Sequence, residues 1–507
     1  MADTQREIER KYESDDSGLP DLTAVAGVAT VIDKGVMNLD AVYYDTADER
    51  LAAAALTLRR RTGGSDAGWH LKVPVAPGVR DEIREPLSDT VPRTLAGLVR
   101  ARVREAELAP VVRLRSDRDV RHLMDAQGKL LAEVSVDAVR AERLTEGGGT
   151  AQWTEIEVEL ADGGDPVFLD KVEKRLRKAG VRPSSSSSKL ARALQETAPG
   201  SAKKKRKASS AAPQDPVTAS DHVLAYVRAQ RDAILELDPA VRQDAHDSVH
   251  RMRVATRRLR STFRSFGKVL DRGVTDPIGE ELKWLAGELG VDRDREVMTE
   301  RLATVLGELP RTLISGPIRT RLRTWANARR GGSRRRLIGV LDSKRYLALL
   351  DTLDAVIAEP PLLPDAAGKP EKVITKAVRK DFGKVSALVA EAMEAPPGAD
   401  RDLALHEARK KAKRTRYAAE AATPALGASA RALTKSMKSL TSLLGEHQDS
   451  VMVRVTLREL SAVAHAAGES SFTYGVLYGR EEQRAAGVEA ALPEAWRAIV
   501  AEGSVQV

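Results

Sequence analysis

The stretch REIERKYE, residues 6–13, carries a charged residue at every second position. Because alternate side chains of a β-strand lie on one face, such a strand would present Glu7, Glu9 and Lys11 together, opposite Ile8. Two carboxylates and an ammonium group would then share one face. A face of this kind is either solvated or lines an enclosed space, and the surrounding sequence has to decide between the two.

Residues up to about 195 contain further short alternating segments. They are AVYYDT, LTLRRR, WHLKVP, VRDEIRE, VVRLRS, LLAEVSVD and WTEIEVEL, and turns containing Gly and Asp separate several of them. Short alternating runs between such turns predict an antiparallel sheet or barrel. Two other segments, TLAGLVRARV and LDKVEKRLRKAG, have the apolar spacing of helices.

Composition limits the classes of function. The chain has 507 residues, no cysteine and a formal net charge of +9. The length predicts two or three domains, and the lack of cysteine excludes disulfides and thiolate metal sites. The positive charge favours a polyanionic partner. With neither a leader-like apolar segment nor a long apolar run, we expect a soluble, cytoplasmic protein without a membrane partner.

The composition changes sharply near residue 197. We predict a first domain over 1–196, a flexible basic linker rich in Ser, Ala, Pro and Lys over 197–217, and a second domain over 218–500. Long stretches of Ala, Leu and Arg predict that the second domain is all-α.

The predicted helical domain contains a repeat. HRMRVATRRLR begins at His250 and HEARKKAKRTR begins at His406, and both have basic residues at offsets 3, 7, 8 and 10 from the histidine. Further on, LAGELGVDRD (285–294) resembles LTSLLGEHQD (440–449). The repeat predicts two halves with one architecture.

The charges of the predicted strands are segregated by strand. Glu155, Glu157 and Glu159 share one face, whereas Arg59 and Arg61 share another. Segregation favours a closed barrel whose bore the charges line. Crowded carboxylates repel unless a cation lies among them, and oxygen ligands suit Mg²⁺ or Mn²⁺. Arginine and lysine opposite them would hold several phosphate oxygens, so the pattern predicts polyphosphate hydrolysis.

The E-x-E-x-K of EIERK resembles the signature of the CYTH superfamily, the triphosphate tunnel metalloenzymes. The resemblance continues in order through YYDT, LRRR, WHLKVP, RDEIRE, LLAEVSVD, EIEVEL and SSSSSK, to about residue 195. It implies an α+β domain with an eight-stranded antiparallel tunnel. It also implies Mg²⁺- or Mn²⁺-dependent hydrolysis of tripolyphosphate, thiamine triphosphate or nucleoside triphosphates, with adenylate cyclase activity in a few members.

The same resemblance implies roles for individual residues. Glu7 and Glu9 would be metal ligands, together with two of Glu155, Glu157 and Glu159, among which parity does not choose. Glu82 and Asp137 would complete the tunnel network. The phosphate-binding residues would be Lys11, Arg59, Arg61, Lys72, Arg115, Arg118 and Lys189.

The two histidine-containing segments are amphipathic as helices. On a helical wheel Arg253, Arg257 and Arg260 lie beside His250, opposite an apolar side. Solvated helices usually interleave Glu with Arg, and this stripe does not, which favours a bound polyanion. Nucleic acid is a less suitable partner because few aromatic residues accompany the charges.

This half resembles the CHAD domain, the conserved histidine α-helical domain, through VHRMRVATRRLRSTF, WLAGELGVDRD, HEARKKAKRTRYAAE and LLGEHQD. The resemblance implies two pseudo-symmetric four-helix bundles that bind inorganic polyphosphate, which would associate the protein with polyphosphate granules. The alternative for the whole chain is a non-catalytic protein that binds or senses polyphosphate. The expected polyphosphate-binding residues are His250, Arg253, Arg257, Arg258, Arg260, His406, Arg409, Lys410, Lys413, Arg414 and Arg416.

Overall fold

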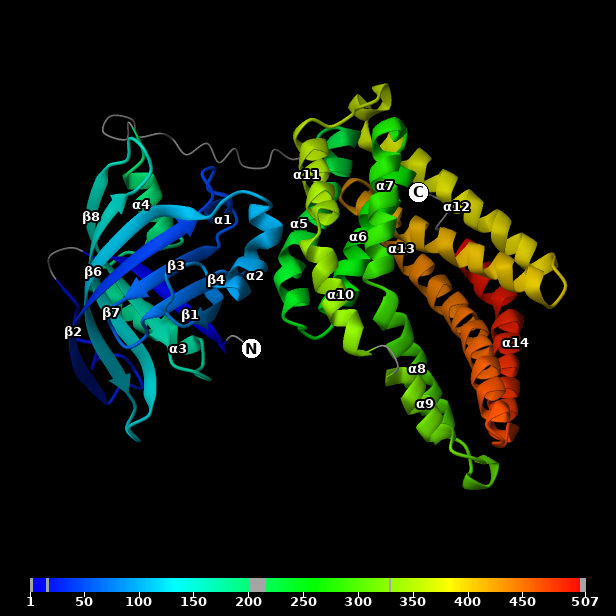
Figure 1. Ribbon diagram of the computed structural model, residues 1–507. Helices are drawn as coiled ribbons and strands as arrows, with labels where there is room; N and C mark the ends of the chain where they lie inside the picture. The colour runs from blue at the N-terminus through cyan, green and yellow to red at the C-terminus, as the bar shows by residue number, and fades with distance from the viewer. Residues whose placement is uncertain (1–2, 15–17, 200–215, 328–329, 502–507) are drawn as a thin grey trace. The chain divides into compact units, whose positions relative to one another are not determined.

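Figure 1 shows a computed structural model of the chain, which describes residues 3–14, 18–199, 216–327 and 330–501, except for the side chains of 292–296 and 330–332. The chain divides into two compact units, Met1–Ser210 and Ala211–Val507, which are treated separately below. The division falls within the predicted linker over 197–217, most of which lies outside the described residues.

The N-terminal unit is a closed barrel of eight strands, in the spatial order β1-β5-β4-β3-β2-β6-β7-β8, and all neighbouring strands are antiparallel. The predicted eight-stranded antiparallel barrel is therefore confirmed. The strands are β1 (Asp3–Glu13), β2 (Thr30–Asp45), β3 (Thr57–Thr62), β4 (Gly68–Ala76), β5 (Val79–Glu85), β6 (Ala109–Met124), β7 (Leu130–Arg143) and β8 (Thr150–Leu160).

The register of the strands determines which side chains enter the bore. Glu9 of β1 pairs with Glu159 of β8, and Arg118 of β6 pairs with Asp137 of β7. Directly opposed residues share a face, so inward positions can be followed from strand to strand. Inward residues are odd-numbered on β1, β2, β3, β7 and β8 and even-numbered on β4, β5 and β6 along most of each strand. The charged face of REIERKYE thus points into the barrel.

Only part of the bore is charged, because a helix and apolar side chains fill one end of it. Leu190 and Ala193 of α4 pack against inward residues such as Tyr43, Val112 and Trp153. The outer surface of the barrel is covered in part by α2 and α3, whose apolar residues form separate clusters with the strands. The helices of this unit are α1 (Arg50–Ala53), α2 (Arg93–Val103), α3 (Val167–Lys178) and α4 (Lys189–Glu196).

The C-terminal unit is built from helices, as predicted. Short 3₁₀ turns lie at Arg311–Leu313 and Pro364–Ala367. Among the residues that the structure describes, no helix combines the length and the apolar character needed to cross a bilayer. The helices are α5 (Ala219–Arg242), α6 (Ser248–Ser265), α7 (Arg272–Glu288), α8 (Val291–Gly307), α9 (Ile318–Asn327), α10 (Arg330–Asp342), α11 (Lys344–Ala358), α12 (Pro370–Glu394), α13 (Ala399–Ala466) and α14 (Phe472–Ala501).

Helix α13 consists of two arms that meet at Gly427, whose φ of 59° is not helical. It runs between α12 and α14, against both of which it packs (Figure 1). The two copies of the histidine repeat lie on α6 and on the first arm of α13, and these helices pack against each other. The apolar side of α6, which includes Met252, Leu259 and Phe263, is buried as the helical wheel predicts.

The β3–β4 turn supplies a test of the barrel. Gly63 has a φ of +81°, and an added Cβ would lie 2.2 Å from the carbonyl oxygen of Asn38. We expect Gly63→Ala to lower the free energy of unfolding of the N-terminal unit by at least about 2 kcal/mol more than Gly128→Ala does. Gly128 is the matched control, since its φ is +77° and its Cβ would meet nothing within 4 Å. Equal melting temperatures for the two variants would contradict the close approach.

Candidate functional site

The charged part of the bore is a cavity of about 340 Å³. It brings together most of the site residues that the sequence predicted, with Arg80, Arg84 and Glu133 in addition. Glu155 and Asp137 lie next to it and contact Lys189, which lines the cavity. The predicted residues that line the cavity are Glu7, Glu9, Lys11, Arg59, Arg61, Lys72, Glu82, Arg118, Glu157, Glu159 and Lys189.

Lys189 lies where a bound cation could lie. Its Nζ is 2.9 Å from Asp137 Oδ2, 2.8 Å from Glu155 Oε1 and 2.6 Å from Glu157 Oε1. Oxygens of these three carboxylates approach within 4.8 Å of one another. The side chain is positioned by α4, which begins at Lys189 and is capped by Ser188, whose Oγ accepts a hydrogen bond from the Ala191 backbone N–H at 3.0 Å. The predicted C-terminal lysine therefore reaches the charged cavity.

Two other cations share this acidic wall. Arg118 donates two hydrogen bonds of 2.8 Å to Asp137 and one of 2.7 Å to Glu157, and Lys11 also pairs with Glu157. Burial would raise the pKa of Glu157, but Lys11, Lys189 and Arg118 outweigh it and hold that pKa well below its ordinary value. Glu157 is thus ionised at neutral pH and already surrounded by positive charge.

The carboxylates around Glu159 are less well compensated. Glu159 is directly opposite Glu9 in the sheet. Burial, followed by the negative charge of Glu7, raises the pKa of Glu159 to about 7 although Lys72 opposes this. Burial also raises the pKa of Glu7, despite its ion pair with Lys72. A divalent cation near these carboxylates would relieve their repulsion, and oxygen ligands suit Mg²⁺ or Mn²⁺, so the residues present fit such an ion.

The structure corrects the expected position of Arg115. Inward residues of β6 are even-numbered, so Arg115 lies on the outer face with Arg113, and both approach Asp40. The side chain of Arg115 is 56% exposed. The physical reason is that β6 begins at the apolar end of the bore, where Val112 and Leu114 point inward. Arg115 therefore does not belong to the cavity.

A buried histidine behind the cavity wall was not predicted as a site residue. His70 is 1% exposed, with Nδ1 2.9 Å from Glu82 Oε1 and Nε2 2.9 Å from the carbonyl oxygen of Asp66. Strand parity puts His70 on the face of Lys72, but no local pattern links it to Glu82. Because Glu82 also contacts Arg59 and Lys72, His70 fixes the carboxylate around which these cations gather.

In the C-terminal unit, a basic cluster lies between α6 and α13. It consists of Arg257 on α6 and Arg409, Lys413 and Arg416 on α13. Burial and then these three arginines lower the pKa of Lys413 to about 7. The Nε atom of Arg409 is buried and has no hydrogen-bond partner among the described atoms, whereas Arg416 Nε is 3.4 Å from Glu420 Oε1. A concentration of half-buried positive charge with an unused donor favours a bound anion.

One contact explains why both repeats include a glycine and an arginine. A Cβ on Gly290 would lie 2.7 Å from Arg253 Cζ, and a Cβ on Gly445 would lie 3.2 Å from Arg409 Nη2. In each half, the glycine of the Leu-Gly pair leaves room for the arginine three residues after the histidine. The repeat in sequence is therefore a repeated packing contact.

Other predicted polyphosphate-binding residues have partners within the protein. Arg258 is 2.9 Å from Glu420, and Arg260 donates to the carbonyl oxygen of Gly279 at 3.1 Å. Arg414 donates to the buried Asp381 at 2.9 Å. Lys410 pairs with Glu407, and His406 Nδ1 is 2.6 Å from Gln448 Oε1, whereas His250 is exposed. The structure therefore does not unite all the predicted residues in one unpaired basic surface.

The chain matches two known domain families. Residues 5–194 match the CYTH domain and residues 225–458 match the CHAD domain. Uncharacterized proteins MT2285 and Rv2226 of Mycobacterium tuberculosis are each 40% identical to this chain over 495 residues, with 94% of this chain and 92% of the relative covered.

Solved structures resemble parts of the chain. PptA from Streptomyces chartreusis is 20% identical, with 55% of this chain and 99% of that chain covered and a TM-score of 0.47. The CHAD domain from the plant Ricinus communis is 26% identical over 55% of this chain and 92% of its own, with a TM-score of 0.43. HpAC1 from Hippeastrum, described as having a dominant triphosphatase activity, is 21% identical over 36% of this chain and 93% of its own, with a TM-score of 0.22.

The contacts of Lys189 predict a metal-dependent stability. Lys189→Met would leave Asp137, Glu155 and Glu157 with less positive charge, and removing one partner from a buried ion pair costs about 3–5 kcal/mol. We expect the melting temperature of the N-terminal unit to fall. Mg²⁺ or Mn²⁺ should then raise the melting temperature of the variant by more than the same ion raises that of the wild type. Lys129→Met, at an exposed lysine, is the control. An unchanged melting temperature would show that Lys189 does not neutralise this wall.

Proposed function

The chain belongs to the family of proteins that join a CYTH domain to a CHAD domain, and from this premise we propose that it is a metal-dependent triphosphatase that binds inorganic polyphosphate. The proposed substrate of the tunnel is inorganic tripolyphosphate, and the proposed cofactor is Mg²⁺ or Mn²⁺. CYTH proteins are often metal-dependent triphosphatases or cyclases. The helical unit would bind the longer polyphosphate chains.

The observation that carries the proposal is the arrangement of charge in the cavity. Lys11, Arg59 and Lys72 face a space that Glu7, Glu9 and Glu159 also face. A triphosphate needs several cationic donors for its oxygens, and its hydrolysis needs the negative charge on the reacting phosphate to be neutralised. A cavity lined by basic residues alone would bind a phosphate polymer. Carboxylates that lack a compensating cation can in addition hold a metal ion.

The proposed reaction breaks one phosphoanhydride bond. A water oxygen forms a bond to the terminal phosphorus, and the bond from that phosphorus to the bridging oxygen breaks, so orthophosphate and pyrophosphate leave. Glu159 lines the cavity and is suited, as a carboxylate, to accept the proton of the water. A bound divalent ion would supply charge neutralisation and lower the pKa of the water.

The cations have separate tasks in this proposal. Arg59 and Lys72 approach Glu82, which keeps both side chains extended into the cavity, where they would bind the phosphate oxygens. Arg61 pairs with Asp66 in the β3–β4 turn, so it lies near the rim of the charged region. Arg118 and Lys189 hold the acidic wall together and would transfer some of their hydrogen bonds to substrate.

A double substitution tests the catalytic proposal. We expect the wild type to release phosphate from tripolyphosphate in Mg²⁺ or Mn²⁺, and Glu7→Ala/Glu9→Ala to lower the rate at least about a hundredfold, because two carboxylates for the ion are lost. The assay measures phosphate from tripolyphosphate, ATP and long polyphosphate, and cyclic AMP from ATP. Glu142→Gln, at an exposed outward position, is the control.

The alternatives correspond to other outcomes of this assay. If the wild type releases no phosphate, or if the double variant is as active as the wild type, the triphosphatase proposal fails. Binding of polyphosphate without turnover would leave a protein that binds or senses the polymer. Formation of cyclic AMP that depends on Glu7 and Glu9 would instead assign adenylate cyclase activity to the tunnel.

The helical unit is tested through the charge of Lys413. Because its pKa is about 7, Lys413 loses its positive charge as the pH rises from about 6 to about 8. We expect the affinity for long-chain polyphosphate to fall about tenfold over that range, the value of one charge-assisted hydrogen bond. The Lys413→Arg variant keeps the positive charge and should bind polyphosphate tightly at both pH values. The Lys413→Met variant should bind polyphosphate weakly at both pH values. A pH dependence that is the same in all three proteins would exclude this role for Lys413.

A further inference from the structure

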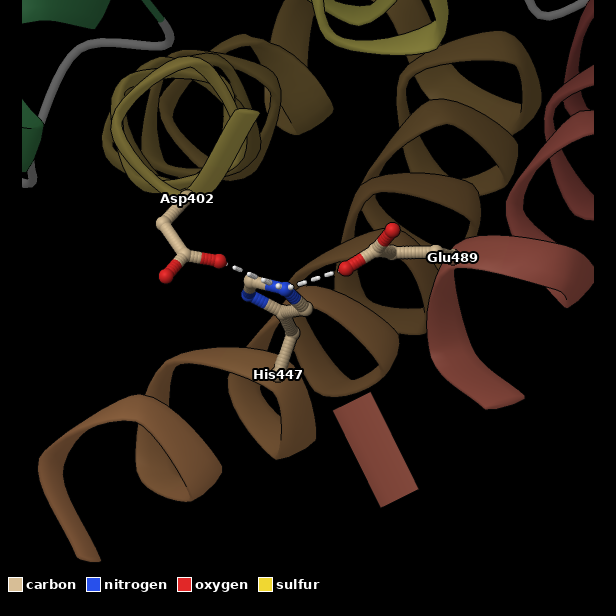
Figure 2. Close-up of side chains that lie close together, drawn as sticks. All are labelled: Asp402, His447 and Glu489. Atoms are coloured by element: carbon tan, nitrogen blue, oxygen red, sulfur yellow. Dashed lines mark hydrogen bonds and ion pairs between the residues drawn. The ribbon is translucent and has the colours of Figure 1, made fainter. Parts of the chain in front are cut away.

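A second group of possible metal ligands lies in the C-terminal unit, far in sequence from the tunnel residues. Figure 2 shows Asp402 from the first arm of α13, His447 from its second arm and Glu489 from α14, with the two carboxylates directed at one imidazole. His447 is 1% exposed. Its Nε2 is 3.3 Å from Asp402 Oδ1 and 3.2 Å from Glu489 Oε1. One buried nitrogen therefore faces two carboxylate oxygens.

The remaining carboxylate oxygens are held by arginines. Arg401 Nη1 donates to Glu489 Oε2 at 2.7 Å, and Arg454 Nη2 donates to Asp402 Oδ2 at 3.3 Å. Each carboxylate thus uses one oxygen for an arginine and directs the other toward His447. Metal ligands are oriented in this way by partners outside the coordination shell. The two guanidinium charges also oppose the binding of a cation, so a moderate affinity is expected.

A single hydrogen bond does not account for both contacts of this trio. Nε2 carries at most one proton, so if it donates to Glu489 Oε1 at 3.2 Å, Asp402 Oδ1 at 3.3 Å faces the same nitrogen without a proton of its own. A metal ion about 2.0–2.1 Å from each ligand atom would separate neighbouring ligands by about 3.3–3.4 Å in a tetrahedron. The two separations from Nε2, 3.3 and 3.2 Å, match that value, and the two carboxylate oxygens lie within 4.8 Å of each other.

We propose that Asp402, His447 and Glu489 bind a divalent transition-metal ion of the Zn²⁺ class, with the fourth position open to water. An imidazole beside two carboxylates suits Zn²⁺ better than Mg²⁺ or Ca²⁺, which prefer oxygen ligands alone. The ion links the two arms of α13 to α14, so its role is to stabilise the helical unit. This site is independent of the tunnel and of the proposed triphosphatase activity.

The ion would also support the basic cluster. Gln448 follows His447 directly, and its Oε1 is 2.6 Å from His406 Nδ1 on the first arm of α13. Fixing His447 therefore fixes the helical turn that contacts the histidine-containing repeat. The proposed metal site lies on the side of this turn that faces Asp402 and Glu489. The proposed polyphosphate-binding residues lie on a different side of the same turn.

The test uses Co²⁺ as a spectroscopic probe of the full-length chain. Glu7→Ala/Glu9→Ala serves as the background so that ions in the tunnel contribute less, and the protein is first stripped with a chelator. We expect one Co²⁺ per chain to give visible d–d absorption typical of tetrahedral nitrogen and oxygen ligands, and Zn²⁺ to displace it. His447→Gln should lose this absorption. His465→Gln, at an exposed histidine of α13, is the matched control and should keep it.

A second measurement covers the case in which His447→Gln does not fold. Glu489→Gln keeps an oxygen that can accept from Arg401, and it should retain the helical circular dichroism while losing Co²⁺ absorption and the rise in melting temperature that Zn²⁺ gives. Equal Co²⁺ spectra with and without these substitutions would overturn the proposal. So would a parent protein that shows neither saturable Co²⁺ binding nor a Zn²⁺-dependent melting temperature, because the trio would then be a hydrogen-bonded contact.

Discussion

Closure of the barrel is the constraint on which the N-terminal unit depends. A closed sheet turns every second side chain into a confined space, where unpaired charges are far more costly than on a solvated face. Each charge in the bore therefore has to meet an opposite charge, and strands alone do not achieve this. Asp137, Glu155 and Glu157 obtain an ammonium group from Lys189 of α4, an element outside the sheet. The apolar residues of α4 fill one end of the bore, so docking of this helix contributes to both the packing and the charge balance of the barrel.

Charge balance is incomplete at one place, and this links the fold to the proposed chemistry. Lys189 and Arg118 hold the pKa values of Asp137 and Glu157 below their ordinary values, although burial acts in the opposite direction. Glu159 has a raised pKa because burial and Glu7 outweigh Lys72. A folded barrel tolerates this imbalance only with a proton or a cation at that position. The same electrostatic deficit that limits stability is what suits the position to a metal ion or to proton transfer.

Strand parity predicted most of the cavity and also explains the error over Arg115. The charged positions of β1 and β8 were recognised because a closed sheet has a strict period of two. Arg115 and Arg118 differ in parity, and β6 stays in register with β7 from Val112 to Leu123, so only one of the two can face inward. A family resemblance suggested both; parity excludes that both face inward, and the register with β7 selects Arg118. The pairing of His70 with Glu82 depends on the register between two strands, which the sequence does not specify.

In the helical unit, the sequence predicted a face for each helix but not the neighbours of that face. The wheel placed Arg253, Arg257 and Arg260 together, and the structure confirms that the opposite side of α6 is buried. Which arginines remain available for a ligand depends on acids distant in sequence, such as Asp381 for Arg414 and Glu420 for Arg258. The trio of Asp402, His447 and Glu489 was missed for the same reason, since its members lie on three helical segments with no shared spacing.

The turn from Glu446 to Asp449 connects these separate features. Successive helical residues differ by about 100° in direction, so four consecutive side chains meet four different surroundings. Glu446 reaches Arg301 of α8 at 3.2 Å, His447 meets the two carboxylates, and Gln448 contacts His406. Asp449 interacts with Arg409 and Lys413 of the basic cluster. A change at any one of these residues shifts the same rigid turn, and occupation of the proposed metal site would therefore alter how Arg409 and Lys413 are presented to a polyanion.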